Sequence, residues 1–241
     1  RRQNRSMQYD VITCGSATVD VFAHTDNEVV EIRAPGMDEK LIAYPSGAKM
    51  LIKQIAFSIG GGGTNTAVGF SRMGLKTGYI GCVGDGANGA MIQRELEKEK
   101  VDFLGHTSKQ KTGYSIILDS IEHDRTILAH KGANNELSFA KIKNAKAKWF
   151  YFSSMMDKSF IAQKKLADYA KKNNIKIAFN PSQYQVKQGI KALKPILTKT
   201  TTLIFNKQEA KLLTNSLNPI EPLHKLGIQY IVITDGPDEL Y

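Results

Sequence analysis

Short apolar runs with the composition of buried strands alternate along the chain with segments of helical period. The helical segments include 88–100, in which Ile92 and Leu96 stand four residues apart, and two later stretches at 159–173 and 207–214. The apolar runs are 9–14, 77–83, 148–153, 175–179, 201–205 and 228–234. Strands that alternate with helices predict a mostly parallel sheet with helices on both faces.

Two regions break this alternation. Residues 112–130 predict a hairpin with strands 114–118 and 125–129, and residues 19–58 contain the extended candidates 19–23, 29–33 and 49–57. Strands offset from the main sheet predict a lid over a binding site. The sequence leaves two possibilities open for the edges of these lid strands. They could pair with a second copy and form a clasp that joins a homodimer, or they could be covered by other segments of the same chain.

The ends of the sequence lead to two expectations. Residues 231–234 predict a buried strand, 235–238 a turn, and 239–241 the start of a returning strand, so we expect the natural protein to continue past Tyr241. Residues 1–6 precede Met7 and are expected to be a disordered or non-native leader. The predicted organisation is one domain over 7–241.

Composition narrows the class of protein. No run approaches the roughly 18 apolar residues of a membrane helix, and no secretory leader follows the basic start, so we expect a cytoplasmic protein without membrane contact. Cys14 and Cys82 both fall in predicted strands and are interpreted as core residues. The net charge of +10 arises from 33 basic and 23 acidic residues. Its lysines spread over several segments, which does not favour nucleic-acid binding.

Four consecutive glycines, 60–63, stand between a predicted strand and a helix expected at 66–73. Glycines there allow close approach of backbone to a ligand and can direct N–H groups outward. Asn65 offers both a donor and an acceptor to hydroxyl groups. A flexible turn with an N-cap would give the same pattern.

A second glycine motif, Gly84-x-Gly86-x-x-Gly89, matches a dinucleotide-binding fingerprint, with Asp102 near the place of a ribose-binding acid. The motif comes late in the chain rather than in the first strand–helix–strand unit, which disfavours a dehydrogenase. No Walker-type Gly-Lys-Ser/Thr occurs, and the five histidines show no zinc-ligand spacing.

Two acidic residues follow predicted strands. Asp20 comes just after the first strand, where open α/β sheets bind ligands, and it could accept two sugar hydroxyls or be an ordinary surface acid. Asn206 and Glu209 have the spacing of a helix capping box. The same pair could hold a hydrated magnesium ion near phosphates.

Taken in order, these segments resemble the ribokinase-like family, also called the phosphofructokinase B type carbohydrate kinases. The resemblance runs from about Tyr9 to Tyr241. It is carried by Gly15 to Asp20, Gly60-Gly61-x-Gly63-x-Asn65, Gly81 to Asp85 with Gly89, Thr112-Gly113, Gly132-Ala133-Asn134, Asn180-Pro181, Asn206-x-x-Glu209 and Thr234-x-Gly236.

The resemblance implies a three-layer α/β/α ribokinase-like (Rossmann-like) sheet with a small β-strand lid. It implies transfer of the γ-phosphoryl group of ATP, with Mg2+, to a hydroxyl of a sugar or nucleoside. The metal residue would be Glu209. The substrate-binding residues would be Asp20, Gly60, Gly61, Gly63, Asn65 and Asn134, and the nucleotide-binding residues Asn180, Asn206, Thr234 and Gly236.

Two departures from the family pattern matter. The family's catalytic aspartate and anion-binding helix start follow the Thr-x-Gly strand, so they are expected beyond Tyr241 and the chain alone is expected to be inactive. A non-catalytic sugar or nucleotide sensor on the same fold is the alternative. Where ribokinases proper carry a substrate-side glutamate, residues 153–156 read Ser-Ser-Met-Met, so ribose is not specifically indicated.

Overall fold

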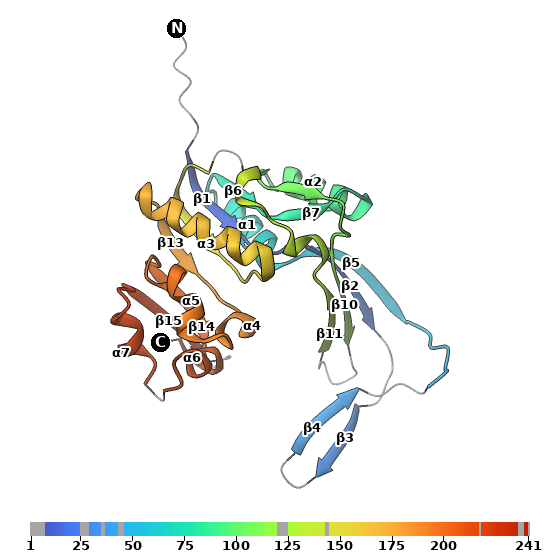
Figure 1. The fold of residues 1–241 in the computed structure, drawn as a ribbon. Helices are drawn as coiled ribbons and strands as arrows, with labels where there is room; N and C mark the ends of the chain where they lie inside the picture. The colour runs from blue at the N-terminus through green and yellow to red at the C-terminus, as the bar shows by residue number, and fades with distance from the viewer. Residues whose placement is uncertain are drawn as a thin grey trace.

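The computed structural model describes residues 8–24, 29–34, 37–42, 46–119, 125–142, 145–216, 218–235 and 239–240. Figure 1 shows an α/β body from which an arm of strands extends. The predicted α/β class is confirmed.

The body is built on an eight-stranded sheet of order β16-β15-β14-β13-β12-β1-β6-β8, parallel except for the pair β15 and β16. Every strand predicted from the apolar runs contributes to it. Its strands are β1 (Tyr9–Cys14), β6 (Thr77–Ile80), β8 (Val101–Phe103), β12 (Ala147–Phe152), β13 (Lys176–Phe179), β14 (Thr202–Asn206), β15 (Tyr230–Asp235) and β16 (Glu239–Leu240).

One face of this sheet carries the larger core. Ile12, Phe150 and Ile177 are buried on it against helices that follow β12 to β14. The phenyl rings of Phe150 and Phe152 lie 5.8 Å apart between centroids. The helices on this side are α3 (Asp157–Lys172), α4 (Gln183–Val186), α5 (Gly189–Leu197), α6 (Lys207–Thr214) and α7 (Ile220–His224).

The second face carries α1 (Gly62–Arg72) and α2 (Ala87–Lys98), which pack by β1, β6 and β8. Their buried side chains Ala67, Ile92 and Leu96 form a smaller cluster with Tyr79. Over β12 to β14 this face instead holds an open depression of about 510 Å³, with Tyr151, Ala178 and Thr202 in its lining.

A four-stranded sheet of order β11-β10-β2-β5 forms the arm, and the hairpin of β3 (Val29–Ala34) and β4 (Met37–Ile42) lies at its far end (Figure 1). The arm strands are β2 (Thr18–His24), β5 (Gln54–Gly60), β10 (Gly113–Asp119) and β11 (Arg125–His130). The predicted hairpin within 112–130 is confirmed by the antiparallel pairing of β10 with β11. Its predicted turn at 122–124 lies outside the described residues.

Three element boundaries differ from prediction. The run 77–83 divides at Gly81 into β6 and β7 (Cys82–Gly84), and β7 pairs outside the main sheet with β9 (His106–Ser108). A side chain at Gly81 would collide with the Tyr79 hydroxyl, 1.8 Å away. Residues 49–53 are not strand. The helix after the glycine run begins at Gly62 rather than at residue 66.

The order of the strands fixes where a ligand can enter. From β1 the chain moves to β6 and β8 on one side, and it returns to the other side with β12 and β13. The connections therefore diverge at the carboxyl ends of β1 and β12. Open α/β sheets bind ligands in the crevice at such a switch point.

The packing of α3 gives a direct stability test. Leu166 is fully buried in α3, whereas Ile161 of the same helix is 55% exposed. Leu166→Ala should lower the free energy of unfolding by about 2–5 kcal/mol through lost burial and a cavity. Ile161→Ala should change it by less than about 0.5 kcal/mol. Urea unfolding of both variants measures the difference, and equal effects would contradict this placement of α3.

Candidate functional site

A cavity of about 270 Å³ opens at the switch point. Its walls come from the residues that follow β1, β12 and β13, from the start of α1 and from the short helix η1 (Gly132–Asn135). Its lining residues are Ser16, Gly62, Lys131, Asn134, Asn135, Ser153, Ser154, Met155, Met156, Asn180, Ser182 and Tyr184.

Ser153 brings an unsatisfied polar group to this cavity. The residue is 5% exposed, and its Oγ has no hydrogen-bond partner among the described residues. Its backbone N–H donates to the Cys14 carbonyl over 2.9 Å, which ties the end of β12 to the end of β1. A buried hydroxyl without a partner costs about 1–3 kcal/mol, so a polar ligand or water is expected to supply one.

Asp20 carries a second buried oxygen without a partner. Its Oδ1 is buried and accepts no hydrogen bond within the described chain. Asp20 lies on β2 opposite β5, and a Cβ at Gly60 would come within 1.9 Å of its Oδ2. Gly60 therefore leaves the room that the carboxylate occupies. The structure brings these two predicted substrate residues into contact.

The glycine run packs α1 against the end of β1. Gly61 has a φ of 102°, and a Cβ there would meet the Ser16 carbonyl oxygen at 2.4 Å. The Gly63 N–H donates to that oxygen over 3.0 Å, and the Gly62 N–H donates to the Ser16 hydroxyl over 3.2 Å. The expectation that this loop directs its N–H groups outward is wrong at these two glycines, because the left-handed Gly61 turns them onto Ser16.

The two predicted substrate asparagines lie in different places. Asn134 is buried and lines the cavity, and its side-chain amide makes two hydrogen bonds to the backbone of Ala17, of 2.8 and 2.9 Å. Asn65 is exposed on α1 and lines a separate depression of about 310 Å³ with Arg72 and Glu95. Asn134 thus fixes the cavity wall, while Asn65 stands outside the lining.

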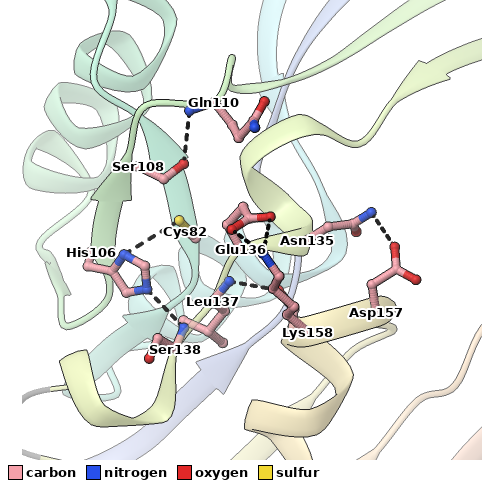
Figure 2. A network of polar contacts seen from close by, with 11 residues as sticks. Cys82, His106, Ser108, Gln110, Asn135, Glu136, Leu137, Ser138, Asp157 and Lys158 are labelled. Carbon is pink, nitrogen blue, oxygen red and sulfur yellow. Dashed lines mark hydrogen bonds and ion pairs between the residues drawn. The ribbon is translucent and has the colours of Figure 1, made fainter.

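A polar network holds the segment that carries Asn134 (Figure 2). The Ser138 N–H donates to His106 Nε2 over 2.9 Å, and Asn135 donates to Asp157 over 2.6 Å. The ammonium of Lys158 lies 3.0 Å from the carboxylate of Glu136. These contacts tie residues 135–138 to β9 on one side and to α3 on the other.

Cys82 borders this network but is not set up as a nucleophile. Its Sγ lies 3.6 Å from His106 Nδ1 (Figure 2). Burial raises the pKa of the Cys82 thiol, and burial also raises the pKa of Cys14. Both cysteines are free and buried, which confirms their interpretation as core residues.

The predicted nucleotide residues follow the same edge of the sheet. The Asn180 side chain donates to the Ile204 carbonyl over 2.8 Å, which joins the ends of β13 and β14. Asn206 and Thr234 are register partners at the ends of β14 and β15. Gly236 lies outside the described residues. Acceptor and nucleotide candidates therefore lie in sequence along one edge, from β1 to β15.

Asn206 and Glu209 form the capping box that their spacing predicts. The Glu209 N–H donates to Asn206 Oδ1 over 2.8 Å, and the Asn206 N–H donates to Glu209 Oε2 over 3.0 Å. Beside them Lys207 Nζ lies 2.6 Å from the carboxylate of Asp235. The described residues contain no group of three or more His, Cys, Asp or Glu side chains placed to hold a metal ion.

The comparisons identify the family. The sequence matches the pfkB family carbohydrate kinase over residues 25–241. The chain belongs to the pfkB family of carbohydrate kinases. The ribokinase of Haemophilus influenzae is 26% identical over 196 residues, which cover 76% of this chain and 62% of that protein.

Solved structures show the same fold. An Arabidopsis thaliana ribokinase complexed with ribose and ATP superposes with a TM-score of 0.75 at 19% identity, covering 97% of this chain and 74% of the other. An adenosine kinase from Sinorhizobium meliloti gives a TM-score of 0.76 at 19% identity, covering 97% and 76%. The predicted ribokinase-like fold is confirmed. These relatives are thus longer than the matched chain.

The dinucleotide-like glycine motif has a packing role in this structure. Gly84 and Gly89 pack against each other, since a Cβ at Gly89 would lie 1.8 Å from the Gly84 carbonyl oxygen. Asp102 accepts a hydrogen bond of 2.7 Å from the Tyr9 hydroxyl. Burial of the Tyr9 side chain, and to a smaller extent its hydrogen bond to Asp102, raise the pKa of Tyr9 to about 12.

Among the described residues, no helix is long and apolar enough to cross a membrane.

The glycine contact between α1 and β1 gives a matched pair of variants. Gly61→Ala should lower the free energy of unfolding by more than about 1 kcal/mol, because alanine at this φ is strained and meets Ser16. Gly69→Ala, in the interior of α1 where a methyl group would enter open space, should raise it by about 0.5–1 kcal/mol. Thermal and urea unfolding measure both changes. A neutral Gly61→Ala variant would refute the contact.

Proposed function

We propose that the protein containing this chain transfers the γ-phosphoryl group of ATP to a hydroxyl of a sugar or nucleoside. The observation that carries the proposal is that Ser153 Oγ and Asp20 Oδ1 are two of the three buried oxygens without partners in the described chain; the third is Gln185 Oε1. The glycine run connects the first two, with Gly60 against Asp20 and Gly62 against Ser153. Hydroxyl groups of an acceptor would satisfy both oxygens.

The nucleotide would bind along the same edge, from Asn180, which also lines the cavity, to Asn206, Thr234 and Gly236. A magnesium ion suits this end only in hydrated form, because one oxygen of Glu209 already serves the capping box. Mg2+ characteristically keeps several waters and binds through one or two carboxylates together with phosphates. When bound, it would neutralise charge on the phosphates. Glu209 would then hold it through its remaining oxygen or through water.

The catalytic base would come from outside the cavity described here. None of the cavity's lining residues is an aspartate, glutamate or histidine. Transfer to a hydroxyl needs a group that accepts its proton. We propose that the base lies beyond Tyr241. We also propose that the arm β2-β5-β10-β11 acts as a lid that excludes water. A cytoplasmic location suits this function.

A phosphoryl-transfer assay separates the kinase from a non-catalytic sensor. The chain ending at Tyr241 should form no sugar or nucleoside phosphate above the background of ATP hydrolysis if the base lies beyond Tyr241, as proposed. The product of the gene read past Tyr241 should turn over at roughly 1–1,000 per second, the ordinary range of enzymes. Turnover by the shorter chain would refute the proposal that the catalytic base lies beyond Tyr241. Binding without turnover by both proteins would favour the sensor.

The arm also supports the proposal of a homodimer. By register, Leu128, Ile116, Val21 and Phe57 form one row across the four strands. Phe57 is 59% exposed, Leu128 54% and Ile116 38%, whereas Val21 is buried. Exposed apolar side chains gathered on one face in this way mark interaction surfaces. A second copy presenting the same row would cover it with a self-complementary interface.

Sedimentation tests the homodimer. The chain should sediment at twice its mass of 26.7 kDa. Phe57→Lys should shift it to the monomer, because a charge would be buried in the interface without a partner. Leu212→Lys is the control, since Leu212 is 44% exposed on α6, away from the arm. A monomeric parent chain at micromolar concentration would contradict the proposal.

A further inference from the structure

Two side chains meet across the opening of the switch-point cavity. Lys131 Nζ lies 5.4 Å from the centroid of the Tyr184 ring. Lys131 directly precedes η1, whereas Tyr184 lies on α4 beyond β13, so they come from different walls of the cavity. The Tyr184 residue is 58% exposed. An aromatic face therefore stands at the cavity with a cation over it.

The helix that presents Tyr184 is fixed from its other side. Gln185 is fully buried, and its Nε2 donates to the Met155 carbonyl over 3.0 Å. Gln163 of α3, also fully buried, donates to the Ser153 carbonyl over 2.7 Å. The two glutamines thus hold both α4 and the loop after β12. The position of Tyr184 is therefore set by the buried side chain of Gln185, the next residue, rather than by burial of the Tyr184 ring.

The cavity accordingly has two chemical zones. Ser16 and Ser153, at the ends of β1 and β12, present hydroxyl groups beside the start of α1. Met155, Met156 and Tyr184 present thioethers and an aromatic ring. Thioethers pack adaptably against aromatic rings. A ligand with a hydroxyl-bearing part and a planar part would match both zones.

The energies favour exchange of the lysine for such a planar group. An exposed cation–π contact is worth about 0.5–1 kcal/mol. A nucleobase stacked on an aromatic side chain contributes about 1–3 kcal/mol. A free sugar has no planar π face to stack on the ring in this way. A displaced lysine keeps three N–H donors that can reach the ring nitrogens or carbonyls of a base.

We propose that the acceptor is a nucleoside, with its ribose hydroxyls towards Ser16 and Ser153 and its base stacked on Tyr184 in place of Lys131. This inference rests on the proposed function and narrows its substrate from a sugar or nucleoside to a nucleoside. Tyr184 and Lys131 are then the residues that determine specificity.

Calorimetric titration of the 241-residue chain with adenosine and with ribose tests this. Adenosine should bind at least about tenfold more tightly than ribose, as one stacked base provides. Tyr184→Ala should weaken adenosine binding by about 5- to 150-fold and leave ribose binding unchanged. Tyr184→Phe keeps the ring and should bind adenosine like the parent. Tyr230→Ala, at a tyrosine 62% exposed on β15, is the matched control.

The outcomes separate this inference from the proposed function. Equal affinity for ribose and adenosine, or equal weakening of both by Tyr184→Ala, would overturn the nucleoside assignment and leave a sugar-binding site in place. Binding of neither ligand by the parent chain would overturn both proposals. If Tyr184→Ala does not fold, Tyr184→Leu keeps the apolar bulk without the ring and carries the same expectation.

Discussion

The backbone contact between the start of α1 and the end of β1 is the constraint on which the candidate site depends. Gly61 adopts a left-handed conformation, and Gly63 comes so close to Gly15 that a Cβ there would lie 2.7 Å from the Gly15 carbonyl carbon. Larger residues would push the helix away from the sheet. With the helix held this close, Gly60 meets Asp20 and Gly62 meets Ser153, and both Gly62 and Ser153 line the switch-point cavity.

Much of the fold could be predicted from the sequence because its signals are local. The six apolar runs predicted six of the eight described strands of the main sheet, and the spacing of Asn206 and Glu209 predicted a capping box that is present. The start of α1 was placed four residues late, because a run of glycines has low helix propensity. Its helical conformation depends on Ser16, 46 residues earlier in the chain than Gly62. Contacts between distant segments leave no local pattern.

Contacts between distant segments also limit how much of the candidate site could be predicted from the sequence. Asp20 and Gly60 could be predicted as ligand residues from their positions beside strands, and they are in contact. Lys131 and Tyr184 could not, because a lysine and a tyrosine far apart in the sequence look like surface residues until the fold places them together. The placement of Asn65 outside the cavity lining likewise depends on the rotation of α1, which the late helix start obscured.

The proposed function places its two substrates along one edge of the sheet. Ser16 and Ser153 of the cavity follow β1 and β12, Asn180 links β13 to β14, and the described nucleotide candidates end at β15. Phosphoryl transfer between two substrates requires them side by side. The cavity and the nucleotide candidates adjoin each other along the carboxyl ends of the strands, which meets that requirement. The arm reaches the cavity wall through β10, which contacts η1, the segment that carries Asn134.

A crystal structure of the chain with a bound acceptor tests the central claim most directly. The account predicts acceptor hydroxyl groups within hydrogen-bond distance of both Ser153 Oγ and Asp20 Oδ1, with the rest of the ligand in the switch-point cavity. An ordered acceptor that leaves both oxygens without a partner, for example one bound in the depression beside Asn65, would contradict it.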